Sequence, residues 1–196
     1  KSLSLYFYHE NSLQRHMKIL FLVPPESITL ESSVPKMLEG GKGFYPKLGL
    51  MYVAGYYERA TGDIPVFIDC PPENYSESEM LAKVKEIRPD MVAMSIMTFN
   101  LLDALQAASA IRKIQPNVKI CLGGPHVNLY PHETLALPNV DYVVFGEGEP
   151  IFTDLVTTLD SKGQDCDELA TITGLGWKRG QKIHINPART DLLELN

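Results

Sequence analysis

The sequence lacks any long apolar run, any excess of basic charge and any close pair of cysteines. A membrane-spanning helix needs roughly 18 or more consecutive apolar residues, and no such run occurs. The 18 lysines and arginines are outnumbered by 24 aspartates and glutamates, which gives a net charge of −6. Nucleic-acid-binding domains are typically basic on one face. We therefore predict no membrane span and no nucleic-acid partner.

The three cysteines, Cys70, Cys121 and Cys166, stand far apart in the sequence. This spacing excludes a metal site of the CxxC type. Cys121 lies inside an apolar segment, so we expect it to be a buried apolar residue. An odd number of cysteines without a signal peptide suits a reducing compartment, and we therefore predict a cytoplasmic location.

The first 16 residues differ from the segment that follows. They have no long apolar core and no small-residue cleavage site, unlike a signal peptide. A strong strand pattern, MKILFLV, begins at Met17. We expect residues 1–16 to be a leader or upstream extension and residues 17–190 to form one domain. A chain of 196 residues with 44% hydrophobic content is long enough for one core.

Apolar segments alternate with amphipathic ones along the chain. The expected strands are residues 18–23, 64–69, 91–96, 118–122 and 140–145. The expected helices are residues 48–62, 76–90, 101–116, 131–137 and 150–163, and a hairpin is expected at 174–186. Gly62 is expected to end the first helix, and Ser76, with Glu79 three residues later, to cap the second. Buried strands that alternate with helices are typical of a parallel sheet covered on both faces. We predict a doubly wound α/β fold, flavodoxin- or Rossmann-like, with five parallel strands in the order 2-1-3-4-5 and a C-terminal β-hairpin.

The loops after the strands are the candidate functional site, because ligands of such sheets bind beyond the carboxyl ends of the strands. The first loop, residues 24–47, far exceeds the usual length of about 2–6 residues, which indicates either a cover over a ligand or a mobile excursion. Ser95 ends the third strand, and a hydroxyl buried there needs a partner. Gly123 and Gly124 allow a ligand to approach the backbone, or simply form a turn. The GEGEP loop, residues 146–150, has two carboxylates that repel phosphate.

Several common activities have no motif in this sequence. No G-x-G-x-x-G follows the first strand, and no P-loop motif occurs. No G-x-S-x-G nucleophile elbow is present. The first strand is followed by VPPES, in which Glu26 is the single acid. A response-regulator receiver needs several acids there to hold magnesium. The two prolines cannot donate the backbone hydrogen bonds that a flavodoxin uses to bind phosphate. The domain therefore shows no catalytic machinery of its own.

Asn100 follows the third strand and is expected to cap the helix that begins after it.

Four segments occur in a fixed order: YPKLGLMYVAGYYERATG, RPDMVAMSIMT, CLGGPHVN and VVFGEGEPIF, followed by the tail GLGWKRGQKIHINPARTDLLELN. Together they resemble the N-terminal cobalamin (B12)-binding domain of the B12-dependent radical SAM proteins. The resemblance covers about Met17 to Asn196. The radical SAM motif C-x-x-x-C-x-x-C is absent, as is the D-x-H-x-x-G motif of methionine-synthase-like domains.

This resemblance implies a cofactor domain of a larger enzyme. The chain would bind cobalamin, whereas SAM and the 4Fe–4S cluster would belong to a downstream radical SAM domain of the same chain. Residues 191–196 would begin the linker to that domain. Cobalamin would bind base-off, with its dimethylbenzimidazole tail between strands and its corrin ring over the carboxyl edge of the sheet. The domain alone would not be catalytic, and the full enzyme would transfer methyl groups.

The resemblance also implies which residues contact cobalamin. They are Pro46, Leu48 and Gly49 in the first loop, Ser95, Met97 and Thr98 in the third, Gly123, Gly124, Pro125 and His126 in the fourth, and Gly146, Glu147 and Gly148 in the fifth. Ser95 would bond the tail base, and the paired glycines would make room for the nucleotide. We expect His126 to contact the tail or the loop rather than to ligate cobalt. No metal ligand is predicted.

Two other functions stay open from the residues alone. The first is a flavodoxin-like interaction or sensor domain that has lost its cofactor or never had one. The second is a stand-alone enzyme acting on a small molecule. The substrate of the full-length protein is not encoded in this domain.

Overall fold

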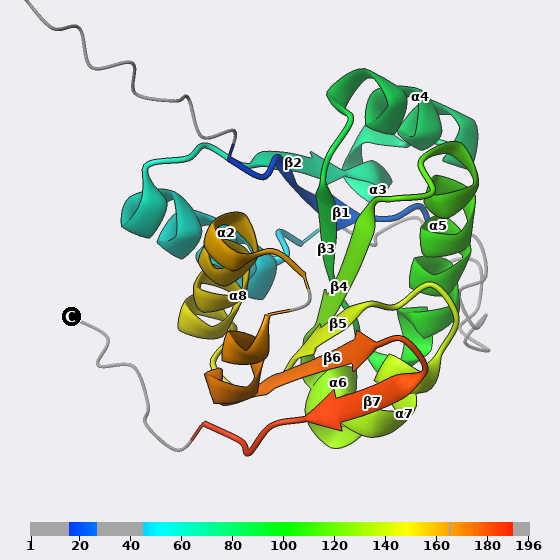
Figure 1. Cartoon of the computed structure of the whole chain (residues 1–196). Helices are drawn as coiled ribbons and strands as arrows, with labels where there is room; N and C mark the ends of the chain where they lie inside the picture. The colour runs from blue at the N-terminus through cyan, green and yellow to red at the C-terminus, as the bar shows by residue number, and fades with distance from the viewer. Residues whose placement is uncertain (1–15, 27–44, 165, 190–196) are drawn as a thin grey trace, which may run out of the picture.

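The computed structural model describes residues 16–26, 45–164 and 166–189. One sheet has the strand order β2-β1-β3-β4-β5-β6-β7 (Figure 1). Its strands are β1 (Ile19–Val23), β2 (Val66–Asp69), β3 (Met91–Ser95), β4 (Lys119–Gly123), β5 (Tyr142–Val144), β6 (Leu175–Arg179) and β7 (Lys182–Ile185). The helices are α2 (Leu48–Thr61), α3 (Cys70–Glu73), α4 (Glu77–Ile87), α5 (Leu101–Ile114), α6 (Pro125–Leu129), α7 (Pro131–Ala136) and α8 (Gly148–Lys162), with 3₁₀ turns η1 (Thr98–Asn100) and η2 (Asp167–Thr171).

The predicted α/β fold with a mostly parallel sheet is confirmed, but the sheet is wider than the five strands predicted. The first five strands pair in parallel. The segment predicted as a hairpin forms β6 and β7, with Gly180 at the turn at a φ of 60°. Strand β6 pairs antiparallel with β5, so Trp177 lies opposite Tyr142. The two C-terminal strands therefore extend the sheet instead of standing apart from it.

Helices cover both faces of the sheet (Figure 1). On one face α2 and α8 pack against alternate strand residues, including Phe21, Ala93 and Cys121. On the other face α4, α5, α6 and α7 pack against the residues between them, including Leu22 and Leu122. Successive strand residues point to opposite faces, so each strand contributes to two separate apolar cores. This arrangement explains why the strand sequences are almost continuously apolar.

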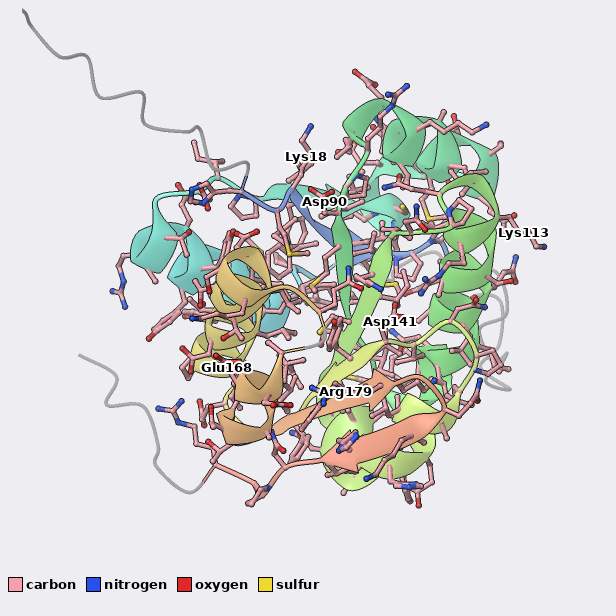
Figure 2. All side chains as sticks on the ribbon, in the orientation of Figure 1. Lys18, Asp90, Lys113, Asp141, Glu168 and Arg179 are labelled. Atoms are coloured by element: carbon pink, nitrogen blue, oxygen red, sulfur yellow. The ribbon has the colours of Figure 1, made fainter. Side chains whose placement is uncertain are left out.

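The polar surface lies outside these layers. Lys113 on α5 and Glu168 on η2 are exposed at the periphery (Figure 2). At the start of β5, the Asp141 carboxylate accepts hydrogen bonds from the Ile120 backbone N–H at 2.8 Å and from the Arg112 guanidinium. These bonds tie α5 and the β4–β5 pair together.

No helix within the described residues is long and apolar enough to cross a bilayer.

The predicted helix ends are confirmed in two cases and wrong in one. Ser76 caps α4 and forms a capping box with Glu79. Gly62 ends α2 in a left-handed conformation, with a φ of 79°. Asn100 stands at the N-cap position of α5 but makes no capping bond. Its Oδ1 accepts instead from the Met97 backbone N–H at 2.8 Å, which stabilises the turn before the helix.

The turn from β4 into α6 joins the ends of the two central strands. Gly124 has a φ of 96° and a ψ of −177°, a conformation that is almost exclusive to glycine. A Cβ at this position would lie 2.6 Å from the Ser95 Oγ and 2.8 Å from the Ile96 carbonyl oxygen. The Ile96 backbone also donates to the Gly123 oxygen and accepts from the His126 N–H. The fold itself therefore requires Gly124, whatever binds beside it.

Replacing Gly124 with alanine is expected to lower the free energy of unfolding by roughly 2–4 kcal/mol, because backbone strain of about 1–3 kcal/mol is added to a steric clash. Urea denaturation followed by far-UV circular dichroism measures this loss. Gly123→Ala is the matched control, since its Cβ would meet only the Val144 carbonyl oxygen, at 3.4 Å. Equal unfolding midpoints for the two variants would contradict this account of the turn.

Candidate functional site

A cavity of about 280 Å³ opens at the carboxyl edge of the sheet, on the face covered by α2 and α8. Strands β1, β3, β4 and β5 form one wall, through residues such as Phe21, Ala93, Cys121 and Val144. The opposite wall consists of α2 and α8, including Phe152. The cavity thus lies between the sheet and a helix layer, where a close-packed protein interior would otherwise be expected.

Small side chains on β3 and β4 create this space. In the parallel register, Ala93 lies beside Cys121 and Ser95 lies beside Gly123. All four residues line the cavity. Because they alternate with residues that point to the opposite core, they form one patch of small side chains on a single face. The helices above cannot close down on the sheet at this point, and a slot remains.

The buried residues of the two walls, which together we call the floor of the slot, are apolar. Phe21, Leu50, Ala93, Val144 and Phe152 are each no more than 8% exposed. The Phe21 and Phe152 rings lie 5.1 Å apart between centroids, with their planes tilted by 51°. This surface suits a flat apolar group better than a charged one.

Cys121 adds a neutral thiol to this floor. Burial, and to a lesser extent the nearby Asp141 carboxylate, raises the pKa of the Cys121 thiol well above its usual value. The thiol is therefore protonated at neutral pH, and it behaves as a small apolar group rather than as a nucleophile or a metal ligand.

The mouth of the slot carries the polar groups. Ser95 is half-buried and lines the cavity. Within the described part of the chain its hydroxyl makes no hydrogen bond, so it is available to a ligand. Glu147 and Glu149, at the start of α8, add partly exposed carboxylates. The site thus offers one free hydroxyl beside an apolar slot, with acids at the entrance.

Most of the residues predicted to contact cobalamin come together at this slot. The lining includes Gly49, Ser95, Gly123, Gly124, Pro125, Gly146, Glu147 and Gly148. Pro46, Leu48 and Met97 do not line it but lie exposed near the same edge of the sheet, Leu48 at the start of α2 and Met97 just after β3. The two groups therefore occupy the interior and the rim of one region.

His126 and Thr98 form a separate pair. The His126 Nδ1 lies 3.0 Å from the Thr98 Oγ1, and the imidazole packs against Tyr130 with 5.3 Å between ring centroids. His126 is 9% exposed and belongs to helix α6, which sequence reasoning treated as a loop. No cluster of three or more potential metal-ligating side chains occurs within the described residues.

Sequence reasoning missed the apolar floor. Phe21, Leu50, Val144 and Phe152 looked like ordinary core residues, because their participation depends on which helix lies opposite each strand. One signal was present in the sequence. Small residues recur two positions apart in both central strands, which places them on the same face.

A second cavity, of about 470 Å³, lies on the α4–α5 side of the sheet. Its lining includes the acids Glu26, Glu77 and Asp103. Glu77 there accepts a hydrogen bond from Gln106 at 2.7 Å. Although this cavity is larger, its acidic lining does not suit a flat apolar group, and the slot under α2 and α8 remains the better candidate.

Known proteins resemble this chain in sequence. Residues 38–156, well over half of the chain, match the family model of the B12 binding domain. An uncharacterized methyltransferase of Pyrococcus horikoshii is 37% identical over 174 residues, which cover 88% of this chain and 35% of that protein. The cobalamin-dependent radical SAM methyltransferase TokK of Streptomyces tokunonensis is 28% identical over 124 residues, 63% of this chain and 17% of that protein. The chain thus spans about a third or less of these relatives.

Solved structures share the fold. TsrM from Kitasatospora setae, a radical S-adenosylmethionine methyltransferase with cobalamin and a 4Fe–4S cluster bound, aligns with a TM-score of 0.68 at 17% identity, over 89% of this chain and 32% of that one. OxsB with aqua-cobalamin and S-adenosylmethionine bound aligns with a TM-score of 0.67 at 16% identity, over 91% and 23%. The resemblance inferred from the sequence motifs is confirmed, and the chain belongs to the B12 binding domain family.

Proposed function

We propose that this chain is the cobalamin-binding module of a B12-dependent radical SAM methyltransferase and that it holds base-off cobalamin at the carboxyl edge of its sheet. The observation that carries this proposal is the slot over Ala93, Ser95, Cys121 and Gly123, which combines an apolar floor with one free hydroxyl. A flat heterocycle such as the dimethylbenzimidazole of the nucleotide tail fits that combination.

Two features of the slot support the fit. Gly123 carries no side chain, and a Cβ there would meet only the Val144 carbonyl oxygen, so the entrance is free of side-chain atoms at this point. The Ser95 hydroxyl can donate a hydrogen bond to a ring nitrogen of the base. Gly124, in contrast, serves the turn, so the two neighbouring glycines have different roles.

Exposed apolar residues at the rim support a large ligand above the slot. Leu48, Met51 and Tyr52 on the first half of α2 are 60%, 48% and 65% exposed. Met97 and Phe99, after β3, are 48% and 46% exposed. Several large apolar side chains exposed along one edge favour a buried interface there. The corrin ring, with its apolar surface, is the occupant proposed for this rim, in contact with Pro46, Leu48 and Met97.

The domain's residues bind and orient the cofactor rather than carry out acid–base chemistry. Bound cobalamin supplies a cobalt centre for methyl transfer. His126, on α6, forms a hydrogen bond with Thr98 at the end of the loop after β3. We propose that it supports this loop and does not ligate cobalt. The downstream radical SAM domain, SAM and the iron–sulfur cluster belong to the proposed full-length enzyme, and a cytoplasmic location stays a prediction from the unpaired cysteines.

Gly123→Leu is expected to weaken hydroxocobalamin binding by roughly 10-fold or more, equivalent to about 1.4 kcal/mol, because the new side chain would occupy the slot. Absorbance of the cofactor that stays with the protein through gel filtration measures binding, and the same spectrum reports the base-off form. Gly55→Leu is the matched control, since Gly55 is exposed on α2 and a Cβ added there would have no atom within 4 Å.

Three results would decide against the proposal. If neither the chain nor a full-length product that contains it retains cobalamin while circular dichroism shows a folded protein, the alternative of a cofactor-free interaction or sensor domain is favoured. If Gly123→Leu binds as tightly as Gly55→Leu, the slot is not the tail site. A base-on spectrum would overturn the binding mode.

His126→Ala is expected to leave the absorption spectrum of the bound cofactor unchanged, because His126 bonds Thr98 rather than facing the slot. The loss of this hydrogen bond is expected to reduce the free energy of unfolding by about 1 kcal/mol. A shift of the cobalt absorption bands in the variant, at full occupancy, would instead identify His126 as a ligand.

A further inference from the structure

Resting on the proposed function, we infer that the slot selects the base of the corrinoid's nucleotide tail. It accepts dimethylbenzimidazole, which presents carbon and methyl groups, and it discriminates against corrinoids whose tail carries adenine. The observation that carries this inference is a contrast within the slot. The floor has no free hydrogen-bonding group, whereas the mouth has the Ser95 hydroxyl and the carboxylates of Glu147 and Glu149.

The side chains of the floor offer almost no polar atom. Phe21, Ala93, Val144 and Phe152 end in carbon alone. Cys121 contributes a thiol, which is a weak hydrogen-bond donor. A ring that enters this space therefore meets only carbon and sulfur atoms from the side chains of these residues.

The backbone of the floor is also committed. Strand β3 is paired with β1 and β4, and β4 is paired with β3 and β5, so their N–H and C=O groups belong to the sheet ladders. Strand β1 is likewise paired on both sides, with β2 and β3. A nitrogen atom on a buried base would find no free backbone partner in these central strands.

The two bases differ in what they would leave unpaired. Besides the nitrogen bonded to the sugar, dimethylbenzimidazole has one ring nitrogen, which the Ser95 hydroxyl at the mouth can satisfy. Adenine has further ring nitrogens and an exocyclic amine at its far edge. Burying a polar group without a partner is unfavourable. One or two such groups correspond to a loss of roughly 10- to 100-fold in affinity.

Carboxylates that could accept a hydrogen bond from the adenine amine are present, but they lie at the mouth of the slot and not at the buried end where the amine would lie. Glu147 and Glu149 are at the start of α8 and remain partly exposed. Phe152, one turn further along the same helix, lines the buried floor. The far edge of a base inserted from the mouth therefore meets Phe152 and its neighbours rather than the acids.

The test compares the dissociation constants of hydroxocobalamin and its adenine-tailed analogue for the same protein, by fluorescence quenching or calorimetry. The wild type is expected to bind hydroxocobalamin at least 10-fold more tightly. Val144→Thr, which places a hydroxyl on the floor at nearly constant volume, is expected to reduce that preference several-fold. Val66→Thr is the matched control, because Val66 packs against the opposite core.

The outcomes separate this inference from the function on which it rests. Equal affinity of the wild type for both corrinoids overturns the selectivity and leaves the cobalamin-binding proposal intact. Failure to bind either corrinoid overturns both. A preference that Val144→Thr leaves unchanged, in a variant that still binds, would show that the floor does not set the selectivity.

Discussion

The packing of small residues on two adjacent central strands determines what this domain can hold. Ala93 and Ser95 on β3 lie beside Cys121 and Gly123 on β4, all on the face that α2 and α8 cover. The opposite face of the same strands carries Met94 and Leu122, which are fully packed. The sheet is therefore close-packed on one side and leaves a slot on the other. Larger residues in the patch would fill the slot.

The surrounding structure keeps the slot open. Phe152 on α8 contacts both Phe21 on β1 and Tyr57 on α2, with 5.1 Å and 6.0 Å between ring centroids. These aromatic contacts fix the distance from the helices to the sheet beside the cavity. At the edge, the glycine turn after β4 holds the end of β3 against the start of α6. The walls of the slot are thus set by the core, and the slot needs no separate scaffold.

The sequence predicted the alternation of strands and helices because each buried strand is an apolar run and each helix has a clear boundary signal. Ser76 with Glu79 and Gly62 are such signals, and both act as expected. The glycine loops also identified the edge of the sheet at which the slot lies. These predictions depend on local patterns, which the sequence carries directly.

The missed features depend on which segments pack together. That β6 would pair with β5 could not be read from the hairpin itself, because strand pairing is a long-range choice. The floor residue Phe152 shows no local difference from other core residues of α8. The motif CLGGPHVN indicated a ligand loop, but its second glycine serves the turn and its histidine bonds Thr98. Residue types were thus easier to predict than the partners they meet.

The most direct test of the account is the difference in affinity between cobalamin and cobinamide, which has the corrin ring but no nucleotide tail. If the slot under α2 and α8 holds the tail, cobinamide should bind this protein at least roughly 10-fold more weakly, a loss of about 1.4 kcal/mol or more. Equal affinities for the two corrinoids would show that the tail is not bound in the slot and would contradict the account.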